Sequence, residues 1–167
     1  MTGAEKGTAM HKFLQYSDFS KLTKSPEQEK LRLLNSGKLS KEEFDCISED
    51  DIIKFTGSKT YEYITNAERA EKEYRFTVNI SAEDIGEKYS GSKDAVLLQG
   101  AMDCLVINSD GMILIDYKTD KVKYLSQLKT RYKKQLDLYK NAAEQIFGKP
   151  VIKCLIYSTR LGEEIEV

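Results

Sequence analysis

Residues 99–119 read QGAMDCLVINSDGMILIDYKT, two apolar runs separated by a short polar segment. The segment contains an Asp-Gly pair at 110–111, which is among the strongest short signals for a β-hairpin. The flanking runs, 95–107 and 112–118, are therefore expected to form two antiparallel strands. This hairpin is the centre of the expected fold.

Two carboxylates and a lysine interrupt the apolar runs. Asp116 and Lys118 are two residues apart, so they should share one face of the sheet. If residues 109 and 110 form the turn, Asp103 pairs with Asp116; if residues 110 and 111 form it, Asp103 pairs with Lys118. Either register places all three charged side chains on the same face.

Two interpretations of this cluster are open. Carboxylates on neighbouring strands, about 5 Å apart at Cβ, repel one another unless a cation lies between them. Mg²⁺ and Mn²⁺ prefer oxygen ligands and also bind phosphate oxygens, and a nearby lysine could hold or deprotonate an attacking water. The alternative is structural: Lys118 neutralises both acids in a surface ion pair.

The segments around the hairpin predict an α/β fold with a helical first part. Helix start signals recur over residues 1–70, including Ser25 before Pro26 and a capping box from Ser40 to Glu43. Beyond them, hydrophobic periodicity predicts a strand from residue 71, a loop over 81–94, a long helix over 126–147, a buried strand over 151–157 and an edge strand over 163–167.

Composition excludes several classes of protein. The 167 residues carry 26 basic and 27 acidic side chains, a net charge of -1, which removes the simplest electrostatic argument for nucleic-acid binding. Three distant cysteines, Cys46, Cys104 and Cys154, cannot form a four-cysteine zinc or iron-sulfur site. No GxxxxGK[ST] segment is present, so no ATP site is expected. Without a long apolar run or signal peptide, the protein is expected to be cytoplasmic.

A basic segment follows the hairpin. Residues 118–134 hold seven basic side chains against the single acid Asp120, a local charge of +6, with Tyr124 and Tyr132 among them. Cations interleaved with aromatic rings suit a phosphate backbone and stacked bases. The competing interpretation is a solvated helix face. The cations expected on DNA include Lys121, Lys129 and Lys133.

Four motifs follow one another along the chain: Gly7-Thr8-Ala9-Met10-His11, Gln99-Gly100-Ala101-Met102-Asp103, Ile115-Asp116-Tyr117-Lys118-Thr119 and Gln135-Leu136-Asp137-Leu138-Tyr139. They resemble, in order, the motifs of RecB-type nucleases of the PD-(D/E)XK superfamily. Alone, His11 is an ordinary single histidine and Gln135 a glutamine at the margin of a helix stripe. Together the motifs span nearly the whole chain and most resemble the carboxy-terminal nuclease domain of the AddA-type helicase-nucleases.

The resemblance implies a restriction-endonuclease-like mixed sheet flanked by helices. It also implies a single nuclease domain over 1–167, helical over about 1–70 and with the catalytic sheet and long helix over about 71–167, belonging to a longer helicase-nuclease.

Site roles follow from the same resemblance. His11, Asp103, Asp116 and the carbonyl of Tyr117 would bind the metal, and Lys118 would serve the attacking water. Gln135 and Tyr139 match the motif associated with DNA contact and site support. Where relatives often have Glu-x-Pro-Phe, this chain has Glu73-Tyr74-Arg75-Phe76, so an auxiliary acidic role for Glu73 is a weaker expectation.

The expected activity is hydrolysis of phosphodiester bonds in single-stranded DNA with Mg²⁺, or Mn²⁺ as a substitute, during the processing of double-strand breaks for recombinational repair. The implied partners are a helicase portion of the same polypeptide and an AddB-like subunit. No association with a membrane is expected. Two alternatives remain. One is a non-catalytic DNA-binding or docking module that retains the fold, and the other is a stand-alone phage-like exonuclease.

Overall fold

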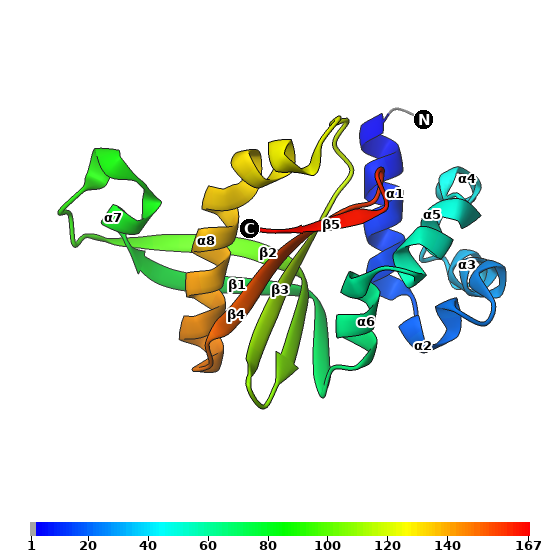
Figure 1. Cartoon of the computed structure of the whole chain (residues 1–167), viewed down its shortest axis with the longest axis horizontal. Coiled ribbons are helices and arrows are strands. Elements are labelled where there is room, and N and C mark those ends of the chain that lie inside the picture. The colour runs from blue at the N-terminus through cyan, green and yellow to red at the C-terminus, as the bar shows by residue number, and fades with distance from the viewer. Residues whose placement is uncertain (1–2) are drawn as a thin grey trace.

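A computed structural model describes residues 3–167 and contains a five-stranded mixed sheet with helices on both faces (Figure 1). The strands lie in the order β1-β2-β3-β4-β5. The elements along the chain are α1 (Gly3–Tyr16), α2 (Phe19–Leu22), α3 (Pro26–Asn35), α4 (Lys41–Cys46), α5 (Glu49–Thr56), α6 (Lys59–Thr65), β1 (Arg69–Ser81), α7 (Ala82–Ile85), a 3₁₀ turn (Glu87–Tyr89), β2 (Ala95–Asn108), β3 (Gly111–Lys118), α8 (Leu125–Phe147), β4 (Val151–Ser158) and β5 (Glu163–Glu166).

Local sequence signals explain where several helices begin and end. The Ser40 side chain accepts a hydrogen bond from the Glu43 N–H, and the Glu43 carboxylate accepts one from the Ser40 N–H. The two bonds complete the expected capping box of α4. Helix α8 ends at Gly148, whose φ of +64° lies in the left-handed region that favours glycine. The expected plain loop over 81–94 is wrong in part, because it contains α7 and the 3₁₀ turn.

The sheet combines two kinds of pairing. Strands β1, β2 and β3 are antiparallel neighbours, β3 and β4 are parallel, and β5 pairs antiparallel with β4 at the edge. Parallel neighbours need a crossover connection, which here is α8. The expected mixed sheet with flanking helices and a helical N-terminal part is confirmed.

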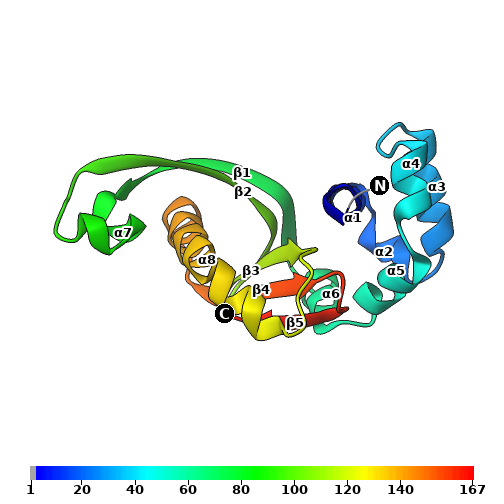
Figure 2. The ribbon, with the colours of Figure 1, turned by 90° about the horizontal axis from the view of Figure 1, so that it is seen from above.

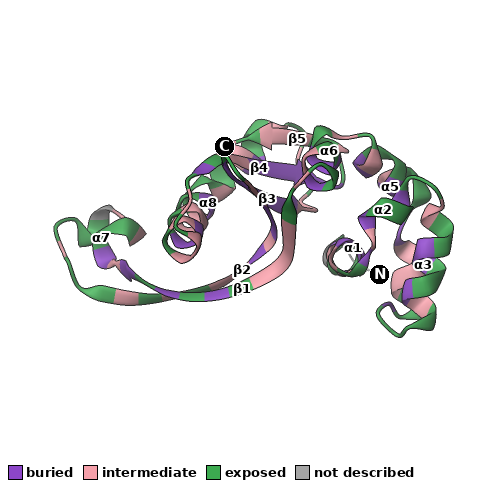
Figure 3. Ribbon diagram, turned by 90° about the horizontal axis from the view of Figure 1, so that it is seen from below, coloured by how far each residue is buried: buried purple, intermediate pink, exposed green. Residues whose placement is uncertain are grey.

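Two hydrophobic cores lie on opposite faces of the sheet. One joins helices α1 to α6 to the alternating side chains Ile113, Ile115 and Tyr117 of β3, and the other joins α8 to Met112 and Leu114. Figure 2 shows the β1–β2 ribbon curving around α8, and Figure 3 shows buried and exposed residues alternating along the far part of that ribbon. The end of β3 therefore lies between the two helical layers.

Among residues 3–167, no helix is both long enough and apolar enough to cross a membrane.

Candidate active site

The β2–β3 hairpin brings the two aspartates together. Asn108 lies opposite Gly111 and Cys104 opposite Ile115, so residues 109 and 110 form the turn. The alternative register, in which Asp103 faces Lys118, is therefore wrong. The next position of the ladder would pair Asp103 with Asp116, and there the Oδ2 atom of Asp103 accepts a hydrogen bond of 2.7 Å from the Tyr117 N–H.

Side chains of β2 change faces at Asp103. Cys104 and Val106 pack with the N-terminal helices, whereas Met102 packs in the core under α8. Met102 and Cys104 are two residues apart and in a regular strand would lie on the same face. The alternation is thus broken between them, at the residue that carries the carboxylate.

Strand β1 is irregular at the matching position. Glu73 has a φ of +49° and is the only non-glycine residue with a positive φ in the described part of the chain. The pairing of β1 with β2 includes Lys72 with Cys104 and then Tyr74 with Met102, but Glu73 and Asp103 between them are unpaired in this ladder. A non-glycine residue in this conformation costs of order 1–3 kcal/mol, and such strain concentrates at functional sites. Because of this break, the Asp103 side chain can contact the residues at the end of β3.

His11 reaches the same point from α1. Its Nε2–H donates to the Tyr117 carbonyl at 2.7 Å, across 106 positions of sequence, and its Nδ1 lies 3.7 Å from Asp103 Oδ1. The imidazole ring also meets the Tyr117 ring edge to face. Three of the four expected metal donors, His11, Asp103 and the Tyr117 carbonyl, are therefore in mutual contact.

Lys118 forms an ion pair with the fourth. Its Nζ atom lies 2.7 Å from Asp116 Oδ2, and the two side chains are only 15% and 6% exposed. The same ammonium lies over the ring of Tyr132, 4.2 Å from its centroid. The ion pair expected under the structural interpretation is present, but it is a buried pair within a larger cluster rather than a surface one.

Burial and mutual repulsion dominate the electrostatics of this cluster. Burial, and then the neighbouring Asp116 carboxylate, raise the pKa of Asp103 to about 6. Burial also raises the pKa of Asp116, although Lys118 opposes the effect. For Lys118, burial favours a lower pKa, but the Asp116 carboxylate outweighs it and raises the pKa above its ordinary value. Two carboxylates with one ammonium leave an excess of negative charge in a buried place.

The donor atoms of the cluster fit a divalent cation. Among the described residues, no three His, Cys, Asp or Glu side chains converge closely enough to hold a metal ion, so His11, Asp103 and Asp116 are neighbours without forming a complete side-chain site. Asp116 Oδ2 is buried and accepts no hydrogen bond of good geometry, despite the nearby lysine. A bound cation would satisfy that oxygen. Carboxylate and carbonyl oxygens with one imidazole are acceptable ligands for Mg²⁺ or Mn²⁺.

An open hollow of about 470 Å³ gives access to this cluster. Its walls include His11, Asp103 and Glu73, together with Gly7 and Thr119. Glu73, expected as an auxiliary acid, therefore faces the same space as two of the expected ligands.

Gln135 and Tyr139 lie one turn apart on α8, and both are half-buried. The Tyr139 ring packs edge to face on Phe76 with centroids 5.1 Å apart. A Cβ atom on Gly100 would come within 2.7 Å of the Tyr139 hydroxyl, which explains the glycine of the second motif. Tyr139 therefore supports the β1–β2 ribbon, while no hydrogen bond within residues 3–167 engages the Gln135 side chain.

Much of the charge in the basic segment is used inside the protein. Lys133 forms an ion pair of 3.0 Å with Asp137, and Lys129 donates to the Glu166 carbonyl at 2.9 Å. Arg131 forms an ion pair with Asp120, which also accepts a hydrogen bond from the Tyr132 hydroxyl.

Three cations of that segment remain available. Lys121, Lys123 and Lys134 are exposed and form no ion pair with any described residue. The segment is thus a mixed surface, with fewer free cations than the +6 count indicates.

Sequence reasoning missed the contact that seats α1 on the end of β3. Gly7 is buried, and a Cβ atom there would collide with the Thr119 hydroxyl. The glycine begins the first motif and the threonine ends the third, so the signal was present, but only the tertiary structure shows that they touch.

Comparisons with known proteins agree with the geometry. The chain matches the family model of the PD-(D/E)XK nuclease superfamily over residues 2–164. It is 34% identical over 165 residues to an ATP-dependent helicase/nuclease subunit from Bacillus licheniformis, covering 90% of this chain and 13% of the relative. It is 35% identical over 170 residues to the protein of the same name from Bacillus mycoides, covering 94% and 14%. The chain thus spans 13–14% of the length of these two relatives.

Proposed function

Because this chain belongs to the PD-(D/E)XK nuclease superfamily, we propose that it is a metal-dependent nuclease that hydrolyses phosphodiester bonds of single-stranded DNA. The observation that supports this most is the meeting of His11, Asp103, Asp116 and the Tyr117 carbonyl at the end of β3. Nucleases of this superfamily generally use divalent metals. These four donors would hold Mg²⁺, or Mn²⁺ in its place.

When bound, the metal would polarise a phosphoryl oxygen and favour formation of hydroxide from water. Lys118 is held beside Asp116 as an ammonium, which suits holding the attacking water and stabilising negative charge in the transition state. The water oxygen forms a new bond to phosphorus while a bond from phosphorus to a sugar oxygen breaks. The leaving oxygen takes up a proton, and the attacking water releases one to solvent.

The wider context of this activity is also a proposal. The relatives are named as subunits of ATP-dependent helicase/nucleases, and this chain matches only a small part of each. A helicase portion of a longer polypeptide would deliver the strand that ends 3′, and an AddB-like subunit would complete the assembly that processes double-strand breaks as an exonuclease.

The test compares cleavage of labelled single-stranded DNA by the wild type, Asp116→Ala and Lys118→Ala, with Mg²⁺ and with EDTA. Asp116→Ala should abolish cleavage and weaken metal binding, measured by calorimetry. Lys118→Ala should abolish cleavage but retain metal binding, because lysine is not a ligand. Lys24→Ala, which changes an exposed cation between α2 and α3, is the matched control.

Cleavage at the wild-type rate in EDTA would refute the metal mechanism. DNA binding without any metal-dependent cleavage would instead support the non-catalytic alternative.

A further inference from the structure

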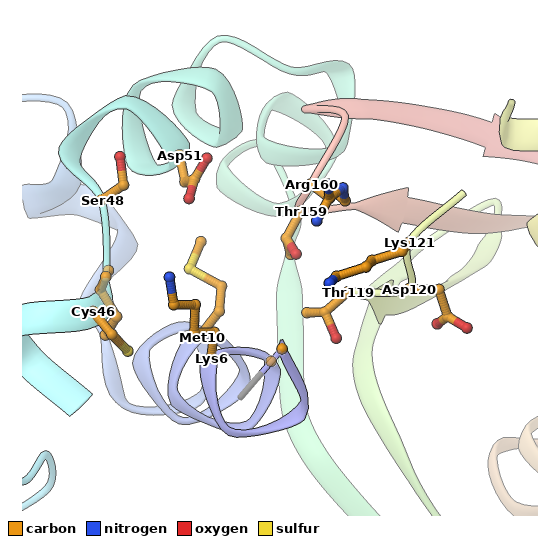
Figure 4. A pocket seen from close by; sticks show the side chains of 13 residues that line it. Lys6, Met10, Cys46, Ser48, Asp51, Thr119, Asp120, Lys121, Thr159 and Arg160 are labelled. Atoms are coloured by element: carbon orange, nitrogen blue, oxygen red, sulfur yellow. The ribbon is translucent and has the colours of Figure 1, made fainter. Parts of the chain in front are cut away.

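A second cavity adjoins the hollow of the proposed nuclease site. Its volume is about 570 Å³, and it lies between α1, the connection from α4 to α5, and the segments that follow β3 and β4 (Figure 4). Gly7 and Thr119 belong to the walls of both cavities, so the two are neighbours. The volume is within the range of sites that bind small molecules.

Positive charge surrounds this cavity. Lys6 of α1, Lys121 after β3 and Arg160 after β4 line it from three separate segments. All three are exposed, and none forms an ion pair with a residue in the described range 3–167. Cations that form no ion pair and border one cavity are suited to an anionic ligand.

The acidic residues of the wall do not cancel this charge. Asp120 forms an ion pair with Arg131 of α8, and Figure 4 shows its carboxylate directed away from the cavity. Asp51 of α5 is the other carboxylate in the wall, and it interacts electrostatically with Lys6 without forming an ion pair. Three cations against one available carboxylate leave a net positive cavity.

The remaining wall offers hydroxyls and an apolar surface. Ser48, Thr119 and Thr159 contribute hydroxyl groups, while Met10 and Ile47 contribute buried apolar side chains. The Thr159 N–H donates to the Lys118 carbonyl at 2.9 Å, so this wall is joined directly to the lysine of the nuclease site. Charge, hydroxyls and an apolar surface correspond to the phosphate, sugar and base of a nucleotide.

We propose that this cavity holds the nucleotide next to the scissile phosphate, with the outer phosphate of that nucleotide bound by Lys6, Lys121 and Arg160. The inference rests on the proposed function, because it takes the scissile phosphate to lie at the Asp103–Asp116 cluster. The strand then passes over the Gly7–Thr119 contact from one cavity to the other.

Binding is tested first without cleavage. A fluorescently labelled single-stranded hexanucleotide is titrated in EDTA at several salt concentrations with the wild type, Lys6→Gln, Arg160→Gln and the control Lys24→Gln. Each cavity variant should bind roughly 5- to 10-fold more weakly, and its slope of log K against log salt should fall by about 0.7, the value for one lost phosphate contact. Affinities and slopes equal to those of Lys24→Gln would overturn the proposal.

Steady-state cleavage assays provide a second test. In Mg²⁺, the cavity variants should show a raised KM for the hexanucleotide but unchanged hydrolysis of bis(p-nitrophenyl) phosphate, which has no neighbouring nucleotide. Equal losses on both substrates would contradict the assignment of the cavity to the neighbouring nucleotide. A wild type that cleaves neither substrate would refute the proposed function and leave the binding result readable.

A deoxynucleoside 5′-monophosphate serves as the competitor. It should displace the hexanucleotide only at much higher concentration, because it lacks the scissile phosphate. Competition at equal concentration would show that the cavity holds a free nucleotide and would overturn its assignment to the strand.

Discussion

Replacing Asp103 by asparagine should make the metal-free protein more stable. The Asp103 carboxylate is largely buried beside Asp116, which raises its pKa from the ordinary 3.8 to about 6. Its contact with the Tyr117 N–H needs only an oxygen acceptor, which asparagine also provides. Asp103→Asn therefore removes a buried charge and preserves the hydrogen bond.

The size of the effect follows from linkage between protonation and folding. Between pH 3.8 and about 6 the folded protein binds more protons than the unfolded chain, so the free energy of unfolding falls as pH rises through this window. The difference between these two pKa values corresponds to a loss of roughly 3 kcal/mol in the free energy of unfolding at neutral pH. This is an upper value, because Asp116 shares the effect. For a chain of this length, 1 kcal/mol shifts Tm by about 2–4 °C.

The assay is thermal unfolding in EDTA from pH 3.5 to 8, followed by circular dichroism. Asp103→Asn should raise Tm at pH 7 to 8, and the gain should vanish near pH 3.5, where the wild-type carboxyl is protonated in both states. Asp137→Asn, which changes an exposed carboxylate on α8, should alter stability by less than about 0.5 kcal/mol.

Metal binding should favour the stability of the wild type over that of Asp103→Asn. Mg²⁺ should raise the Tm of the wild type, because it binds the folded state, and should raise that of Asp103→Asn much less. A variant that unfolds below the wild type in EDTA at pH 7, or that gains equally at pH 3.5, would refute the assignment of excess negative charge to this cluster.

Three further predictions concern the surroundings of the site. Gly7→Ala should lower stability by roughly 1–3 kcal/mol and reduce cleavage, because the new Cβ collides with Thr119; thermal unfolding and nuclease assays check it. Lys123→Gln should reduce the salt dependence of binding to single-stranded DNA more than Lys133→Gln, because Lys133 is already paired with Asp137; equal effects would contradict this. Cleavage by the isolated chain should be independent of ATP and should stop soon after excess unlabelled DNA is added, whereas continued degradation over hundreds of nucleotides would contradict the prediction.

Local chemistry determined much of the fold. The Asp-Gly pair, the two apolar runs, the Ser40 capping box and the glycine at 148 each act within a few residues of their own position, through turn geometry, alternation and helix capping. The hairpin, the long helix and the helical first part were therefore predictable. The sequence also placed Asp103 and Asp116 near each other, because both possible registers of the hairpin put them on the same face of neighbouring strands.

The sequence could not fix which of two turns forms, because the Asp-Gly pair suits either register. The two registers differ by two residues, so both keep every side chain on the same face, and the alternation along the strands could not choose between them. The structure has the turn at residues 109 and 110.

The assembly of the site was decided by tertiary structure alone. His11 meets the Tyr117 carbonyl across 106 positions, and no local rule relates the two. The change of faces at Glu73 and Asp103 breaks the alternation on which strand prediction depends. The charge of the basic segment is redistributed by ion pairs such as Arg131 with Asp120. Contacts between distant segments depend on the packing of whole elements against one another, whereas short patterns determine only the elements themselves.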